Sequence, residues 1–215
     1  MSALSFSVLP PSEGERRQAA YPLQKVIRAR RGGDPVYVGR GVPPGGRDAA
    51  AAGAGGGARP RFTLYRDLAG REPLGLVVRP PSGQPSGGRL SVLGPGGEEL
   101  GELCTPAKRA RWRPRWEIRP AGGDALTGRG GTVTSWAVCV LLSPLWLVLN
   151  LFWAVGGSGD SAWSLPVRTA WRHGPGRPAS LKYHGLSARY VLRTGSLDTR
   201  LAYAQAVVHQ ARGSS

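Results

Sequence analysis

Residues 197–212 read LDTRLAYAQAVVHQAR, and this stretch predicts an α-helix more clearly than any other part of the chain. It contains no Gly or Pro, and either Ser196 or Asp198 would be a suitable N-cap. Over residues 201–208 the apolar side chains lie around most of the helix, interrupted only by Gln205. A helix that is apolar nearly all round needs burial on every side. A sheet curled around it would provide that burial, so this stretch predicts a β-barrel that encloses a C-terminal helix.

The chain upstream of this helix predicts the strands of such a barrel. The 215 residues include 33 Gly and 19 Pro, which favour frequent turns over long helices. Two similar hairpins, residues 62–78 and 90–103, each combine an alternating apolar strand, a Gly-containing turn and a return strand with Leu-Gly. Shorter alternating strands are predicted at 165–172, 181–183 and 189–193. We therefore expect a β-rich, mainly antiparallel domain that forms a closed or nearly closed barrel.

The N-terminal quarter of the chain predicts less structure. Residues 1–20 are mostly polar, contain two consecutive prolines and predict a disordered tail. Residues 21–40 fit a short hairpin, and residues 41–60 form a Gly/Ala/Pro-rich linker that cannot bury a core. The barrel domain is therefore expected to cover residues 61–212.

Residues 109–119 predict a strand with a basic side and a tryptophan-rich side. Arginine occupies most odd positions, whereas Trp112 and Trp116 occupy even positions, and alternate side chains of a strand point to opposite faces. Pro114 cannot donate to a ladder, which favours an edge or a bulge. A solvated strand face is one explanation of the arginines. The alternative that we predict is a site for anionic phosphate groups, made of Lys108, Arg109, Arg111, Arg113 and Arg115.

Residues 133–155, VTSWAVCVLLSPLWLVLNLFWAV, are unlike the rest of the chain, because no charge occurs between Arg129 and Asp160. At about 1.5 Å per residue, a helix of this length would cross a hydrocarbon core of about 30 Å. Ser143-Pro144 in the middle favours a segment that dips into the bilayer and returns. The alternative is an element buried in the protein core. The predicted membrane-contacting residues are Trp136, Leu141, Leu142, Leu145, Trp146, Leu147, Leu149, Leu151, Phe152 and Trp153.

Three short motifs carry a resemblance to a known family. They are Gly96-Gly97-Glu98-Glu99-Leu100-Gly101, Arg115-Trp116-Glu117-Ile118 and Leu197-Asp198-Thr199-Arg200-Leu201-Ala202. In this order they resemble the superfamily of Tubby C-terminal, phospholipid scramblase and LURP-one-related domains, over residues 61–212. The resemblance implies a closed antiparallel barrel threaded by a hydrophobic helix, and a role at membranes in binding phosphoinositides or moving lipids. The calcium-binding stretch of scramblases is not matched, because residues 193–198 contain one carboxylate where several are needed.

The sequence contains no pattern typical of catalysis or metal binding. His173, His184 and His209 are isolated, and Cys104 and Cys139 lack metal-ligand spacing. No Gly-x-Ser-x-Gly elbow, P-loop or pair of carboxylates suited to acid-base chemistry occurs. These observations predict a non-enzymatic protein without a cofactor or metal. They also leave His209 as a helix C-terminal residue favoured by the helix dipole.

The net charge of +16, carried almost entirely by arginine, predicts a surface attracted to polyanions. The N-terminus lacks the basic and apolar regions of a signal peptide, so we expect contact with a membrane at its cytoplasmic face. The leading hypothesis is a membrane-associated, non-enzymatic protein that binds anionic phospholipid, and the resemblance extends this hypothesis to a scramblase-like role. One alternative is a nucleic-acid-binding module that stacks bases on Trp112 and Trp116. Another is a structural protein that uses the apolar run as a partner interface.

Overall fold

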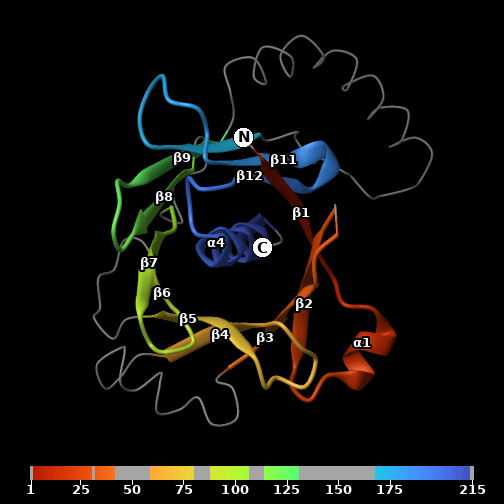
Figure 1. The fold of residues 1–215 in the computed structure, drawn as a ribbon. Coiled ribbons are helices and arrows are strands. Elements are labelled where there is room, and N and C mark those ends of the chain that lie inside the picture. Colours follow the sequence, from red (N-terminus) through yellow and green to blue (C-terminus); the bar gives the residue numbers. More distant parts are fainter. Residues whose placement is uncertain are drawn as a thin grey trace, which may run out of the picture.

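The computed structural model describes residues 2–30, 32–41, 59–79, 88–106, 114–130 and 168–213. In this part of the chain, twelve strands form a closed barrel around a helix, as Figure 1 shows. The strand order is β1-β12-β11-β10-β9-β8-β7-β6-β5-β4-β3-β2, and every neighbouring pair is antiparallel. The prediction of a closed antiparallel barrel around the C-terminal helix is confirmed.

The strands are short, and each one pairs with the next along the chain, while β12 pairs with β1. The strands are β1 (Ala3–Leu9), β2 (Leu23–Ala29), β3 (Val36–Gly39), β4 (Arg59–Tyr65), β5 (Pro73–Arg79), β6 (Arg89–Leu93), β7 (Glu99–Cys104), β8 (Arg115–Pro120), β9 (Leu126–Gly130), β10 (Thr169–Arg172), β11 (Leu181–His184) and β12 (Arg189–Arg193). The helices are α1 (Glu13–Gln18), the 3-10 turn η1 (Gly185–Ser187) and α4 (Thr199–Gly213).

The prediction of a disordered tail over residues 1–20 is wrong. Ala3–Leu9 forms β1, which pairs with β2 on one side and β12 on the other and so closes the barrel. Phe6 and Val8 point into the core, each at most 2% exposed, while serines occupy the alternate positions. This period of two is what a half-buried strand requires, although its serines make the segment look polar overall. The barrel domain therefore begins near residue 3 and includes β2 and β3 within residues 21–40, instead of beginning at Arg61.

Two further details of the sheet differ from expectation. Pro114 was expected at an edge or bulge, but a closed barrel has no edge, and Pro114 lies immediately before β8. Its carbonyl oxygen accepts a hydrogen bond from the backbone N–H of Gly130 at 3.4 Å. Strand β9 was not predicted, because its sequence, LTGRG, contains two glycines and little apolar alternation.

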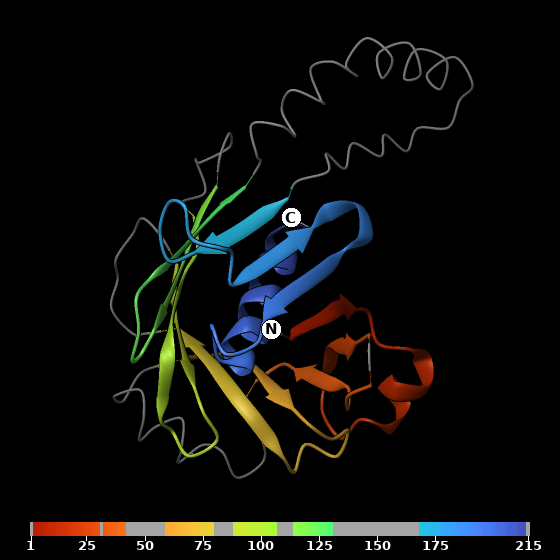
Figure 2. The ribbon, with the colours of Figure 1, turned by 45° about the horizontal axis from the view of Figure 1, so that its top comes forward.

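Helix α4 lies inside the barrel, as the two ribbon views show (Figures 1 and 2). Every residue from 201 to 208 is buried, including Gln205. The inward side chains of the strands surround the helix, and the largest of them are Trp116 and Trp171, followed by Tyr190. Burying a large apolar side chain contributes about 1.5–3 kcal/mol, so enclosing this helix is a major part of the stability of the fold.

The two ends of the barrel are defined by the direction of α4. The side chain of Asp198 accepts a hydrogen bond from the backbone N–H of Arg200 at 2.8 Å and caps the helix start. Near the other end of α4, the Gln210 side-chain amide donates to the carbonyl oxygen of Val8 at 2.9 Å. We call these ends the Asp198 end and the Arg212 end. Because the strands alternate in direction, β2, β4, β6, β8 and β10 end at the Asp198 end, and β1, β3, β5, β7, β9 and β11 end at the Arg212 end.

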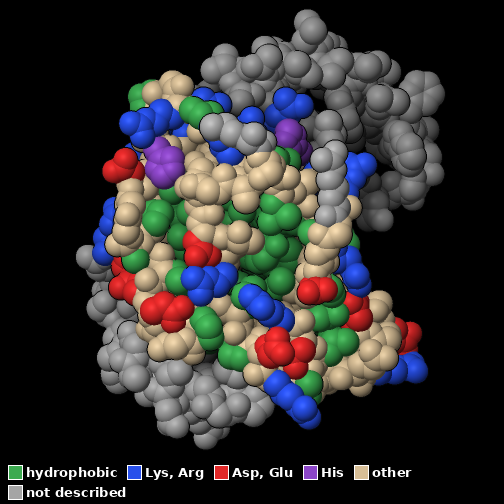
Figure 3. Space-filling model, viewed as in Figure 1, with side chains coloured by type: hydrophobic (Ala, Val, Ile, Leu, Met, Phe, Trp, Pro, Cys, Tyr) green, Lys and Arg blue, Asp and Glu red, His purple; other side chains and the backbone are tan. Residues whose placement is uncertain are grey.

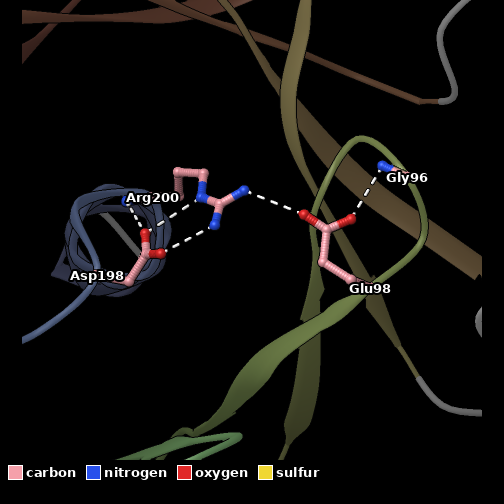
Figure 4. A network of polar contacts seen from close by, with 4 residues as sticks. All are labelled: Gly96, Glu98, Asp198 and Arg200. Carbon is pink, nitrogen blue, oxygen red and sulfur yellow. Dashed lines mark hydrogen bonds and ion pairs between the residues drawn. The ribbon is translucent and has the colours of Figure 1, made fainter.

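A network of polar contacts fixes the start of α4 to the turn between β6 and β7. On the face seen in Figure 3, acidic and basic side chains are interspersed among hydrophobic ones. The Arg200 guanidinium contacts both oxygens of Asp198 at 3.2 and 3.0 Å, and its Nη1 donates to Glu98 Oε1 at 3.1 Å. Glu98 Oε2 accepts the Gly96 backbone N–H at 3.0 Å (Figure 4). Two of the family-like motifs, 96–101 and 197–202, therefore meet in space.

Gly128 creates room for the two largest side chains of the core. It faces Trp116 on β8 and Trp171 on β10 in the strand register, and a Cβ atom at Gly128 would lie 2.4 Å from Trp171 Nε1. We expect Gly128→Ala to lower the free energy of unfolding by about 1–3 kcal/mol, because an overpacked core must shift. Denaturant unfolding measures this. Gly122→Ala, which adds a methyl group into open space, is the control. Equal stability of the two variants would contradict the packing described.

The Asp198 carboxylate is expected to stabilise the fold at neutral pH. Its burial favours the protonated form, but hydrogen bonds from Arg200 outweigh this and hold the Asp198 pKa below its ordinary value of 3.8. We expect Asp198→Ala to cost about 1–2 kcal/mol at pH 7, as loss of a cap and an ion pair does. The difference from wild type should disappear as the pH falls below 3.8 and through the folded-state pKa, because this stabilisation requires the ionised carboxylate. Asp124→Ala, which removes only an exposed contact to Arg177 at 4.0 Å, is the control in the same urea titrations.

Candidate anion-binding surface

Five cationic side chains gather on the outer face of strands β8 to β12 near the Arg212 end. In the register, Arg115 faces Arg129, which faces Ala170, which faces Lys182. One step closer to the barrel end, Arg168 precedes β10, and Arg189 faces His184 across β11 and β12. We call this set the basic band; its members are Arg115, Arg129, Arg168, Lys182 and Arg189.

The basic band is not neutralised by acidic residues in the described part of the chain. Arg115 and Arg129 are both exposed and lie directly opposite each other, an arrangement that is unfavourable for like charges. Glu117 is two residues from Arg115 on the same face, but its carboxylate is paired with Arg119 at 2.8 Å. None of the five members forms an ion pair with another described residue. A surface of this kind favours an external anion.

His184 reports the electrostatic potential of the basic band. Its pKa lies below the ordinary value of 6.5, first because it is partly buried and then because Arg168, Lys182 and Arg189 are near. The three positive charges oppose a fourth on the imidazole. His184 is therefore neutral at pH 7, and its pKa is a measure of how much positive charge surrounds it.

A second basic feature, the arginine cleft, lies at the same barrel end. It is a hollow of about 710 Å³ between the sheet and the last turns of α4. Arg40 follows β3, Arg61 lies in β4 and Arg79 ends β5, while Phe62 and Val207 are among the apolar residues of its wall. The lining contains no carboxylate among the described residues; its full set is Gln24, Arg40, Gly41, Arg61, Phe62, Arg79, Val207, Val208 and Ala211.

The cleft arginines repel one another. Desolvation lowers the pKa of Arg61, and the nearby charges of Arg79 and Arg212 lower it further. Arg212 Nη1 is buried and has no hydrogen-bond partner within the described part of the chain. Arg212 does not itself line the hollow, so its contribution there is the positive charge that it adds near Arg61.

The cleft at the Asp198 end has a different character. It has a volume of about 670 Å³ and carries both signs of charge, with Asp34 and Glu72 opposing Arg66 and Arg200. Arg200 is already engaged by Asp198 and Glu98. Mixed charges that can pair internally do not favour an external anion, so the candidate surface is at the Arg212 end.

The structure describes one of the five predicted phosphate-binding residues. Arg115 is exposed and belongs to the basic band. Lys108, Arg109, Arg111 and Arg113 lie outside the described residues, as does the whole predicted membrane-contacting set within 133–155. The nearest described residues on either side of 133–155 are Gly130, at the end of β9, and Arg168, before β10, and both lie at the Arg212 end.

In the described part of the predicted 109–119 strand, which is β8, the side that carries Trp116 faces the core. Trp116 is only 3% exposed and contacts His209 with a ring-centroid distance of 5.0 Å. It cannot stack on a nucleic-acid base, so that part of the nucleic-acid hypothesis is wrong. Trp112 lies outside the described residues.

His209 is not a charged residue favoured by the helix dipole. Its ring lies among the rings of Trp116, Trp171, Tyr183 and Tyr190 at centroid distances between 4.8 and 6.0 Å. Burial lowers its pKa to about 4, so it is neutral at pH 7. Its Nδ1 lies 3.0 Å from the Tyr190 hydroxyl, a contact that belongs to the core.

Sequence reasoning missed most of the basic residues that the fold gathers. Arg40, Arg61 and Arg79 come from three different strands, and only the barrel register brings them to one hollow. Strand alternation marks Arg129 and Arg189 as outward-facing once their strands are known. It does not show that those strands are close neighbours.

The comparisons with known proteins identify no relative. No family model, curated protein or solved structure matches the chain. Within the described ranges, no group of His, Cys, Asp or Glu side chains could hold a metal ion. In the same ranges, no helix has the length and apolar character needed to span a membrane.

The pKa of His184 should respond to the charges of the basic band. We expect Arg168→Gln combined with Arg189→Gln to raise this pKa toward 6.5, because two repelling charges are removed. Imidazole NMR signals followed across a pH titration give the value directly. Arg30→Gln with Arg71→Gln, which removes two exposed charges near the Asp198 end, should leave it unchanged. A His184 pKa that does not move in the first variant would contradict the proximity of these charges.

Proposed function

We propose that this protein is a membrane-associated, non-enzymatic protein that binds anionic phospholipid through the basic band at its Arg212 end. The observation that carries the proposal is the set of five cations on adjacent strands with no paired carboxylate among the described residues. Each basic group close to an anionic bilayer contributes about 1 kcal/mol, so such a set supplies useful affinity without an enclosed pocket.

The position of the apolar run supports the same orientation. Gly130 and Arg168 flank the segment that contains residues 133–155, and both lie beside members of the basic band. A bilayer approached by the band would therefore meet the Arg212 end first, where this segment connects to the barrel. Insertion of the run into lipid, by the residues from Trp136 to Trp153, remains a prediction from its sequence.

Membership of the Tubby, scramblase and LURP-one-related superfamily is part of the proposal. Support comes from the barrel that encloses the C-terminal helix, and from the ion pair between Glu98 and Arg200, which joins two of the resembling motifs. Known members of this superfamily tend to work at membranes, and the location that we propose for this protein is the cytoplasmic face of a membrane.

Flotation with liposomes tests the proposed function. We expect the protein to float with vesicles that contain phosphatidylserine and not with pure phosphatidylcholine, and to be released as the salt concentration rises. The triple variant Arg129→Gln, Arg168→Gln, Arg189→Gln should bind about a hundredfold more weakly, because three contributions of about 1 kcal/mol are lost.

A matched triple variant at the other end provides the control. Arg30→Gln, Arg71→Gln, Arg177→Gln removes the same net charge from exposed positions in turns at the Asp198 end. It should retain most of the binding. Equal loss in both variants would mean that net charge alone drives association, and binding that ignores the phosphatidylserine content would remove the basic band from the explanation.

A further inference from the structure

We infer that the arginine cleft is a binding site for a phosphomonoester dianion, distinct from the basic band that contacts the membrane surface. The inference rests on the proposed function only for the lipid form of this ligand. The site itself is argued from the shape, charge and wall of the cleft.

The shape of the cleft suits a small anionic group better than a flat surface does. It is an open hollow of about 710 Å³ bordered by β2, the residues after β3, β4, β5 and the last turns of α4. Arg40, Arg61 and Arg79 extend from three neighbouring positions in the strand order, so their guanidinium groups can approach one ligand from different directions. The basic band, in contrast, lies on the convex outer face of the sheet.

The charge of the cleft calls for an anion with more than one negative charge. Arg61 lies near the positive charges of Arg79 and Arg212, and none of the three forms an ion pair with a described residue. Three arginines, Arg40, Arg61 and Arg79, line the hollow, and no carboxylate among the described residues lines it with them. A phosphomonoester offers three terminal oxygens and two charges above its second pKa of about 6. A phosphodiester or a carboxylate offers one charge and two such oxygens, which leaves more of these donors unsatisfied.

The wall of the cleft indicates what is attached to the phosphate. Phe62, Val207 and Val208 are buried core residues that also border the hollow. A phosphate esterified to a glycerol backbone would place its ester carbons against this wall. The same phosphomonoester group occurs in soluble ligands and in the lipid phosphatidic acid. The vesicle experiment below distinguishes these two sources.

The stability of the unliganded protein distinguishes an anion-binding role of the cleft arginines from a purely structural one. Arginines near the C-terminal turn of a helix can stabilise its unpaired carbonyl groups, so their removal would destabilise the fold. If the cleft arginines instead bind an anion, they repel one another when no anion is present. Removing Arg61 and Arg79 should then leave the unliganded protein equally or more stable, most clearly at low ionic strength.

Thermal unfolding of the full chain with soluble anions is the first measurement. At pH 7.5 we expect inorganic phosphate and glycerol 3-phosphate to raise the unfolding temperature more than chloride at the same ionic strength, and to lose much of this effect at pH 5, where the ligand is a monoanion. Arg61→Gln with Arg79→Gln should abolish the phosphate effect. Arg30→Gln with Arg71→Gln should keep it.

Vesicles distinguish the lipid from the free ligand. If the ligand is a lipid headgroup, wild type should bind phosphatidic acid vesicles about tenfold more tightly than phosphatidylserine vesicles of equal surface charge, and the cleft variant should lose this preference. If the ligand is a soluble phosphomonoester, glycerol 3-phosphate should stabilise the protein without any vesicle preference.

The two proposals fail separately. The cleft variant should still float with phosphatidylserine, and the triple variant of the basic band should still respond to soluble phosphate. A phosphate effect that survives in the cleft variant would overturn the assignment. So would the absence in wild type of both a phosphate effect and a preference for phosphatidic acid, or a loss of stability in the unliganded cleft variant that indicates a structural role.

Discussion

The complete burial of helix α4 is the constraint on which this structure depends. A helix with apolar side chains on all sides has no face that water can cover, so the sheet must surround it. Twelve short strands achieve this, and each contributes inward side chains at alternate positions. The alanines of α4, Ala202, Ala204 and Ala206, are fully buried, which shows how closely the sheet approaches the helix.

Closure of the sheet also determines where function can reside. The inward faces of the strands are occupied by the core, so only the outer face and the two ends remain for binding. The Asp198 end is engaged by internal ion pairs such as that between Arg200 and Glu98. The Arg212 end instead collects arginines from several strands without matching carboxylates among the described residues. This difference between the ends is the basis for assigning the anion-binding surface.

The fold could be predicted from the sequence because its strongest signals are local. The periodicity of residues 201–208 defines a helix that needs burial, and the two hairpins after Arg61 are visible from their turns. The N-terminal strand was missed, since Ser5 and Ser7 make β1 look polar although Phe6 and Val8 are core residues. The arginine cleft could not be predicted, because its members are separated by long stretches of sequence and meet only through the register of β3, β4 and β5.

The pairing of β1 with β12 joins the two ends of the chain. Ala3 lies opposite Arg193, and the backbone N–H of Thr194 donates to the carbonyl oxygen of Ser2 at 3.2 Å. During synthesis, β1 has no partner on this side and the barrel has no central helix until residues 189–213 have emerged from the ribosome. Folding into the final architecture therefore waits for residues 189–213, and contacts this distant in sequence form slowly. Until then the unfinished barrel exposes unpaired strand edges, which are prone to pair with other chains.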